Sequence, residues 1–221
     1  MKYMFISDVH GNIEGLKKCI MIFSKIEADK LVLLGDTSGS YYDDTNEQIA
    51  QILNDMKDKI EVIRGNCDPQ DFEDMLDFEI FDDDMFFIKR KKYERVDDFT
   101  LINGKKIEST SMSEWFQKEE QEEKDLSKPY ITISVTHGNY FNYSHLPPNC
   151  GDVFIQGHTH IPQLIKSQGR ILANPGSIGR PRAESLSCYV LVDEESIRLI
   201  TLDGTLINEI KFNDGFYISL P

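Results

Sequence analysis

Apolar runs alternate with helix-like stretches over the first part of the chain. The apolar runs, each of which has the length of a buried β-strand, are 3–7, 30–34 and 60–64. The stretches with helical spacing that follow them are 12–27, 45–58 and 69–77. Asn12 stands where the N-cap of the first helix is expected. This order predicts right-handed crossovers and a parallel sheet.

Short β-like runs replace this alternation after residue 78. They are 85–88, 99–102, 130–135, 152–156, 163–166, 170–173, 187–192, 196–201 and 205–211. The pairs predicted to form hairpin turns between them are Asn103-Gly104, Gln168-Gly169 and Asp203-Gly204. The second part is therefore predicted to be mixed or antiparallel sheet. The 221 residues are expected to form one domain, 1–221.

Two charged stretches interrupt the β-rich part. Residues 71–84, DFEDMLDFEIFDDD, are acidic and precede the basic run 89–92; a solvated loop with compensating charge is predicted rather than an acidic metal site. Residues 108–129, ESTSMSEWFQKEEQEEKDLSKP, are predicted to be an insertion with a polar helix. The insertion is either a solvent-exposed helix pinned by Trp115 and Phe116, or a lid or interface element.

The composition argues against several classes of protein. A formal net charge of −14 disfavours nonspecific binding to nucleic acid or to an anionic membrane, because both need a basic face. No run approaches the ~20 apolar residues of a membrane helix. The N-terminal stretch lacks a signal-peptide cleavage site, which predicts a cytoplasmic location. The cysteines form no C-x-x-C pair, so neither a zinc knuckle nor a disulfide framework is indicated.

Metal-capable side chains collect where apolar runs end. They are Asp8, His10, Asp36, Asn66, His137, His158 and His160. Ligands of open α/β sheets sit at the carboxyl ends of strands, and the glycine beside each site lets the turn approach a shared centre. An extended D-x-H or H-x-H stretch places both side chains on one face, so these pairs are expected to converge. All but one of the five histidines belong to this set, and His145 is predicted to be a loop residue.

This set has more ligands than one metal ion uses. Two ions with a bridging carboxylate would each keep open positions for water and substrate. Mixed imidazole and carboxylate ligands suit manganese, iron or zinc. Such ions clamp the attacking and leaving oxygens of a displacement at phosphorus, and a bridging water that loses its proton would be the nucleophile. The sequence has no Walker loop, G-x-G-x-x-G motif or Ser-His-Asp order.

The same motifs carry a family resemblance. They are MKYMFISDVHGN, LVLLGD, VIRGNCD, THG, VFIQGHTHIP and NPGSIGRPR. In this order they resemble the calcineurin-like metallophosphoesterase superfamily, and within it the YfcE-like phosphodiesterase subfamily of bacteria and archaea. The resemblance covers about 1–87 and 130–215. It implies a mixed α/β fold: a four-layer αββα sandwich of two mixed β-sheets flanked by helices.

The resemblance also implies an allocation of ligands. The first ion would be held by Asp8, His10 and His160. The second ion would be held by Asn66, His137 and His158. Asp36 would bridge the two ions. The bridging carboxylate, Asn66 and His137 are expected to take part most directly in catalysis. Mn²⁺ is the expected metal, with Ni²⁺, Co²⁺, Fe²⁺ and Zn²⁺ as alternatives.

Cys67 stands where many superfamily members have a histidine that assists the transition state or the leaving group. A nucleophilic cysteine would need a lowered pKa and a nearby base, and a metal-bound hydroxide already supplies a nucleophile. As a ligand the thiolate would be soft beside oxygen and nitrogen donors. We favour the interpretation that Cys67 is a small side chain at the edge of the site and does not supply the proton that the histidine of other members would donate. The enzyme should then prefer substrates with good leaving groups.

Further residues near these motifs are candidates for contacts with the substrate phosphate. They are Asn12, Cys67, Asn139 and Arg180, with Arg182 as an alternative to Arg180. The run 174–177 is predicted to be a rigid turn, because Pro175 fixes its backbone.

We therefore predict a phosphodiesterase that acts on a small phosphate ester. One alternative is a phosphomonoesterase of low activity. Another is a protein-interaction scaffold that retains metals and is related to the retromer subunit of similar fold. The complete ligand set counts against the scaffold. A homo-oligomer is compatible with the sequence, which does not determine the oligomeric state.

Overall fold

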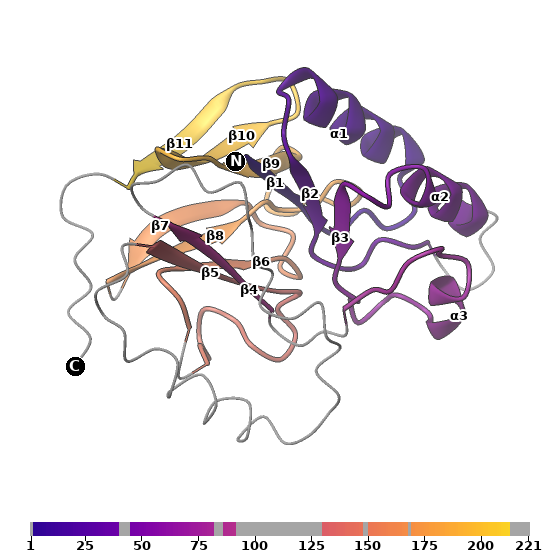
Figure 1. The fold of residues 1–221 in the computed structure, drawn as a ribbon, viewed down its shortest axis with the longest axis horizontal. Coiled ribbons are helices and arrows are strands. Elements are labelled where there is room, and N and C mark those ends of the chain that lie inside the picture. Colours follow the sequence, from indigo (N-terminus) through magenta and orange to yellow (C-terminus); the bar gives the residue numbers. More distant parts are fainter. Residues whose placement is uncertain are drawn as a thin grey trace.

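Two β-sheets pack face to face in the computed structural model (Figure 1). The structure describes residues 2–39, 45–81, 86–91, 130–147, 150–167 and 169–212. The first sheet has six strands in the order β11-β10-β9-β1-β2-β3, and the second has five in the order β4-β5-β6-β8-β7.

Both sheets are mixed. The parallel strands occupy one side of the first sheet and the centre of the second. The strands of the first sheet are β1 (Tyr3–Ile6), β2 (Lys30–Leu33), β3 (Ile60–Val62), β9 (Cys188–Val192), β10 (Ser196–Thr201) and β11 (Leu206–Lys211). Those of the second are β4 (Phe86–Lys91), β5 (Tyr130–Thr136), β6 (Val153–Gln156), β7 (Gln163–Ser167) and β8 (Arg170–Asn174). β1, β2 and β3 are parallel in one sheet, and β5, β6 and β8 in the other. Their carboxyl ends define where a site can form.

The described helices all belong to the first half of the chain. They are α1 (Ile13–Lys25), α2 (Thr45–Asn54) and α3 (Gln70–Glu73). Asn12 caps α1, because its side chain accepts a hydrogen bond from Gly15 N at 3.0 Å. α2 and α3 are shorter than the pattern predicted. α2 ends at Asn54 and α3 at Glu73, although Met56 and Leu76 beyond these ends also pack against the core.

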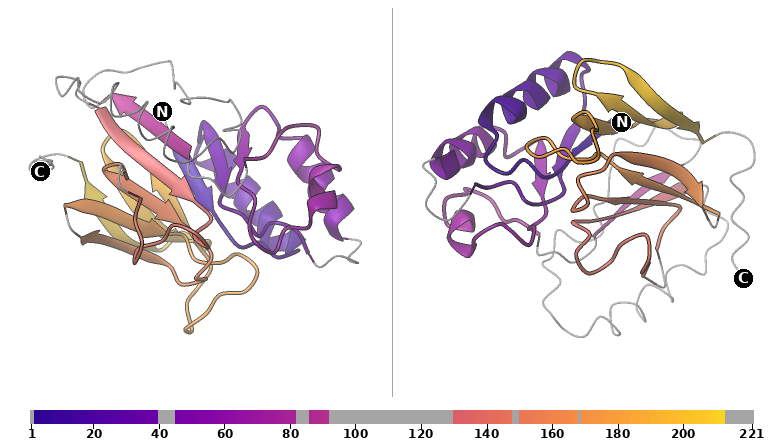
Figure 2. Two further views of the ribbon diagram at one scale, coloured as in Figure 1. Left: turned by 90° about the horizontal axis from the view of Figure 1, so that it is seen from below. Right: turned by 180° about the vertical axis from the view of Figure 1, so that it is seen from behind.

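Alternation along β1 divides the core into two layers. Tyr3 and Phe5 face the second sheet and join the cluster between the sheets. Met4 and Ile6 face the helices and pack in a second cluster with Leu16 of α1. Figure 2 shows α1 and α2 covering the outer face of the first sheet. The predicted arrangement of two mixed sheets with flanking helices is confirmed.

The outer face of the second sheet carries a smaller apolar cluster. Phe154 of β6 and Leu172 of β8 pack there with Cys150, and Phe141 and Tyr143 lie against them. In the described part of the chain, this face is therefore covered by residues 141–147 and Cys150 rather than by a helix.

The hairpin and loop predictions have mixed outcomes. β7 and β8 are joined at Gly169, and β10 and β11 at Asp203-Gly204, as predicted. The loop prediction is wrong for residues 89–91, which belong to β4 and pair with β5. The run 99–102, the turn 103–104 and the insertion 108–129 lie outside the described residues. Among the helices that are described, none is long and apolar enough to span a membrane.

Candidate metal centre

Parallel strands of both sheets end at one place. The predicted ligands follow the carboxyl ends of β1, β2, β3, β5 and β6, and they are Asp8, His10, Asp36, Asn66, His137, His158 and His160. The contacts below join all of them into one connected group. The convergence that the sequence predicted is therefore present in the structure.

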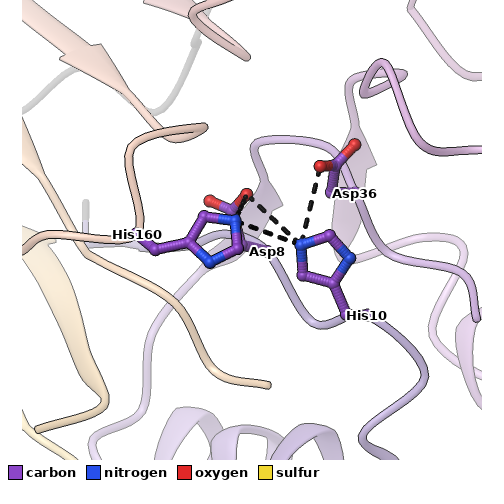
Figure 3. A group of neighbouring side chains, drawn as sticks. All are labelled: Asp8, His10, Asp36 and His160. Atoms are coloured by element: carbon purple, nitrogen blue, oxygen red, sulfur yellow. Dashed lines mark hydrogen bonds and ion pairs between the residues drawn. The ribbon is translucent and has the colours of Figure 1, made fainter. Parts of the chain in front are cut away.

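One half of this group is built on Asp8, His10 and His160. His160 Nε2 lies 3.2 Å from Asp8 Oδ1 and 3.2 Å from His10 Nε2. Ligand atoms of these residues and of Asp36 lie within 4.8 Å of one another, and their side chains point into a common space in Figure 3. We call Asp8, His10 and His160 the first half-site.

The other half is built on Asn66, His137 and His158. His137 Nε2 lies 3.0 Å from Asn66 Oδ1 and 3.3 Å from His158 Nδ1. His158 thus presents Nδ1, while His137 presents Nε2. We call these residues the second half-site.

Asp36 lies between the two half-sites. Its Oδ2 is 3.6 Å from His10 Nε2, and its Oδ1 is 3.5 Å from His137 Nε2. Oδ1 also accepts a hydrogen bond from Cys67 N at 2.8 Å. Each carboxylate oxygen of Asp36 therefore faces a different half-site.

The ligands reach this place through strained backbone. Asp8, His10, Asp36, His158 and His160 all have a positive φ, between 46° and 64°. This left-handed region is uncommon for residues other than glycine and is concentrated at functional sites. The expectation of extended D-x-H and H-x-H stretches was wrong, because tight turns place these side chains. His158 and His160 consequently serve different half-sites.

Backbone carbonyls fix the orientation of two imidazoles. His137 Nδ1 lies 2.7 Å from Leu34 O, and His160 Nδ1 lies 2.7 Å from Arg180 O. A carbonyl only accepts, so each Nδ1 carries the proton and donates it. Each Nε2 is then left with its lone pair aimed at the centre, which is the form of histidine that binds a metal.

The charge state of the group also fits a cation. Burial lowers the pKa of His10 to about 4, so its ring is neutral at neutral pH. Asp8 Oδ1 is buried and has no hydrogen-bond partner among the described residues. A buried carboxylate oxygen without a partner is costly unless a cation takes its place, so this atom together with the converging imidazoles fits a divalent metal.

Comparisons with known proteins agree with this geometry. Residues 1–196 match the family model of the calcineurin-like phosphoesterase superfamily domain. The chain belongs to the calcineurin-like phosphoesterase superfamily. The predictions of family and of a hydrolytic phosphoesterase are thereby confirmed.

Individual relatives cover almost the whole chain. Phosphodiesterase YfcE of Escherichia coli strain K12 is 26% identical over 222 residues, covering 96% of this chain and 99% of that protein. The solved structure of this E. coli phosphoesterase superposes with a TM-score of 0.69 at 23% identity, over 96% of this chain and 100% of that one. Vps29 of Chaetomium thermophilum has a TM-score of 0.55 at 12% identity, over 97% and 100% of the two chains. These structural likenesses confirm the fold.

A cavity of about 410 Å³ opens onto the candidate metal centre. Its lining residues are His10, Asp36, Asn66, Cys67, His158, His160, Arg180, Pro181 and Arg182. The side chains of Arg180 and Arg182 form no hydrogen bond or ion pair with the part of the chain that the structure describes. Among the described lining residues these are the only Lys or Arg side chains, and both border the space that an anion would occupy.

Cys67 is exposed in this cavity. Burial of its thiol and the adjacent Asp36 carboxylate raise the pKa of Cys67 to about 11. The thiol is therefore protonated at neutral pH in the protein alone, which does not suit a nucleophile. Asn66 Nδ2 lies 3.3 Å from its sulfur.

The other predicted substrate contacts, Asn12 and Asn139, do not line the cavity. Asn12 uses both ends of its amide: Oδ1 accepts from Gly15 N, and Nδ2 donates to Ile178 O at 3.0 Å. Asn139 Oδ1 is buried without a hydrogen-bond partner among the described residues. His145 is an exposed loop residue, as predicted.

Two residues outside the predicted site hold its loops. Ser177 Oγ donates to Asp8 O at 2.7 Å and accepts from Arg180 N at 2.7 Å. Asp68 accepts hydrogen bonds from Thr37 N and Ser38 N, each at 2.8 Å. The signal for Asp68 was its place in a glycine turn, where an aspartate often binds backbone N–H groups. Ser177 belongs to the turn predicted at 174–177, and its two hydrogen bonds connect this turn to the loops of Asp8 and Arg180.

Proposed function

We propose that this protein is a metal-dependent phosphodiesterase with a dinuclear centre. The observation that carries the proposal is the position of Asp36, whose two carboxylate oxygens face the two half-sites separately. A bridging carboxylate of this kind is what a pair of ions requires. The substrate would be a small phosphate ester that fits a cavity of about 410 Å³.

The chain's residues suggest how the ions would be held. Asp8, His10 and His160 would hold one ion, and the second half-site would hold the other, with Asp36 between them. When bound, two divalent ions supply a hydroxide nucleophile at neutral pH and stabilise charge on the attacking and leaving oxygens. We propose Mn²⁺ as the metal on the basis of the family resemblance. The mixed imidazole, carboxylate and amide oxygen donors fit it, and they fit Ni²⁺, Co²⁺, Fe²⁺ and Zn²⁺ as alternatives.

The side chains of the rim would bind and orient the phosphate. Arg180 and Arg182 line the cavity, and guanidinium groups match the geometry of phosphate oxygens. Asn66 Oδ1 and His137 Nε2 lie 3.0 Å apart, so both can present a lone pair to the same ion. The contacts from Arg180 and Arg182 would orient the phosphate relative to both half-sites, and such positioning of the substrate contributes to catalysis.

Cys67 favours a diester with a good leaving group. A histidine at this place would donate a proton, whereas the thiol with a pKa of about 11 is a weak acid. A substrate whose leaving group is already acidic does not need that proton. The similarity to phosphodiesterase YfcE over 96% of the chain supports a diester rather than a monoester.

A scaffold role is the second candidate, because Vps29 shares the fold. A scaffold would need no connected set of metal ligands and no strained backbone to place them. Both features are present here, so we favour the enzyme.

Hydrolysis of a model diester tests the proposal. Metal-free protein is supplied in turn with Mn²⁺, Ni²⁺, Co²⁺ and Zn²⁺, and the release of nitrophenol is followed from bis-p-nitrophenyl phosphate and from p-nitrophenyl phosphate. We expect turnover of the diester with Mn²⁺ and a lower kcat/KM for the monoester. No turnover with any of the metals would rule out the enzyme, and faster turnover of the monoester would rule out the diesterase.

The variant Arg180→Ala tests whether the arginines that line the cavity contribute to substrate binding. A hydrogen bond to a charged group contributes about 1.5–3 kcal/mol, so KM for the diester should rise by roughly tenfold or more while kcat changes less. Arg170→Ala is the control, because Arg170 begins β8 at the end of the strand that is remote from the site. Equal KM values for Arg180→Ala and the control would remove Arg180 from the substrate site.

A further inference from the structure

Asp68 is a half-buried carboxylate whose hydrogen bonds all run to two loops of the site. Its Oδ1 accepts from Thr37 N at 2.8 Å, Ser38 N at 2.8 Å and Ser38 Oγ at 2.9 Å. Its Oδ2 accepts from Gly65 N at 2.8 Å. One side chain thereby joins the loop after β2 to the turn after β3.

These two loops carry Asp36 and Asn66. Thr37 and Ser38 directly follow Asp36, whose φ of 52° is strained for a residue with a side chain. The hydrogen bonds to the next two N–H groups hold the backbone in that conformation. Cys67 N also donates a hydrogen bond to Asp36 Oδ1. The turn after β3 is therefore held to the loop after β2 both by Asp68 and by the carboxylate of Asp36.

The two half-sites depend to different degrees on the hydrogen bonds of Asp68. Asn66 is exposed and lies in the turn that Asp68 closes. Ligands of the first half-site have other supports: Ser177 Oγ donates to Asp8 O, and Arg180 O holds the ring of His160. Loss of Asp68 would therefore free Asn66 and tilt Asp36 while the first half-site kept its own contacts.

We propose that Asp68 is a positioning residue that makes the second half-site able to bind its ion. The inference rests on the proposed dinuclear centre. Asp68 does not touch the metal or the substrate; it acts through Asn66 and Asp36. Partners that orient metal ligands typically contribute 10- to 100-fold to metal affinity, which sets the size of the expected effect.

The variant Asp68→Asn tests this directly. The amide keeps the size of the side chain but replaces one accepting oxygen by an NH₂ group, so at least one of the four donors loses its acceptor. The control is Asp193→Asn, because Asp193 also closes a turn, by accepting from Glu195 N and Ser196 N far from the site; unlike Asp68, it also pairs with Arg198.

The readout is Mn²⁺ binding by titration calorimetry, together with the electron paramagnetic resonance signal of the bound ions. Wild-type protein and Asp193→Asn should bind two ions and give the exchange-coupled signal of a pair. Asp68→Asn should keep the first ion within about twofold, bind the second roughly 10- to 100-fold more weakly, and give the signal of a single ion at two equivalents.

Two results for Asp68→Asn would overturn the inference. Two ions bound to this variant with wild-type affinities would show that Asp68 is not needed. Loss of both ions together, with a lower melting temperature of the metal-free protein than in Asp193→Asn, would show a general structural role. If Asp68→Asn does not fold, Ser38→Ala, which removes one of the four contacts, must still weaken the second ion selectively. A wild-type protein that binds one ion would instead refute the dinuclear centre itself.

Discussion

At the scale of single residues, Asp36 connects the two halves of the site. It is 2% exposed, and its carboxylate contacts one half-site through each oxygen. Replacing one oxygen by an amide would leave one half-site without an anionic ligand while keeping the volume of the side chain.

Asp36→Asn should therefore lose most of the activity. We expect kcat/KM for the diester to fall by at least about 100-fold, since even partners that only orient metal ligands contribute about 10- to 100-fold. Asp203→Asn, in the turn between β10 and β11, serves as the control for loss of a carboxylate. Steady-state kinetics at saturating Mn²⁺ measures the effect, and a change below about threefold would contradict the bridging role of Asp36.

Cys67→His tests the account of the missing proton donor. The imidazole is a better acid than a thiol with a pKa of about 11, so esters with poor leaving groups should gain relative to activated ones. General acid catalysis contributes about 100- to 10,000-fold, and a gain of about tenfold in the rate ratio would already be decisive. Rates for a series of aryl and alkyl diesters provide the measurement. An unchanged dependence on the leaving group would refute this interpretation.

The convergence of these side chains was predictable, but their backbone conformation was not. Asp8 and His10 stand directly after an apolar run and beside glycine, a pattern that can be recognised from the sequence alone. Their positive φ values follow from the meeting of loops that are distant in sequence. Asp68 was missed for a similar reason, because its partners Thr37 and Ser38 are about 30 positions away.

At the scale of elements, the turn after β3 is packed against the loop after β2. A Cβ on Gly65 would overlap with Asp36 N and Asp36 Oδ1. These atoms cannot move without displacing the Asp36 carboxylate, so glycine is required here by close approach rather than by its φ.

Gly65→Ala should consequently weaken metal binding as well as folding. Overpacking of this kind typically destabilises by about 1–3 kcal/mol. Gly169→Ala is a matched control, because Gly169 has a φ of 74° and no atom near its missing Cβ. Both variants should unfold at lower denaturant concentration, but only Gly65→Ala should lose Mn²⁺ affinity in calorimetry. Equal Mn²⁺ affinity in the two variants would contradict the close packing of these loops.

The ends of the helices were harder to predict than their existence. The helical spacing of 45–58 continues beyond Asn54, where α2 ends. Periodicity did not reveal this end, because Met56 packs against the core from outside the helix. The turn at Gly169 was predictable, since glycine beside two alternating runs determines a hairpin locally.

At the scale of the whole molecule, the site joins two separate sheets. β1, β2 and β3 bring ligands from the first sheet, and β5 and β6 bring them from the second. The switch from alternating to β-rich pattern predicted that two kinds of sheet would be present. Their face-to-face packing is a long-range property that was implied by the family resemblance rather than by the pattern.

Metal binding across this junction should stabilise the entire fold. A ligand present at 100 times its dissociation constant adds about 2.7 kcal/mol per site to the free energy of unfolding. For a chain of this size that corresponds to a rise in Tm of roughly 5–10 °C for one ion. Differential scanning calorimetry with Mn²⁺ and with a chelator measures the shift, and Asp36→Asn should show a smaller one. A Tm that does not respond to Mn²⁺ would contradict a metal centre between the sheets.

The central claim is a pair of metal ions that acts on a phosphodiester. Its most direct test is a titration of metal-free protein with Mn²⁺, in which the rate of bis-p-nitrophenyl phosphate hydrolysis is measured at each addition. Two ions that share Asp36 predict little activity up to one equivalent and full activity at two. Full activity at one equivalent, or none at any Mn²⁺ concentration, would contradict the account.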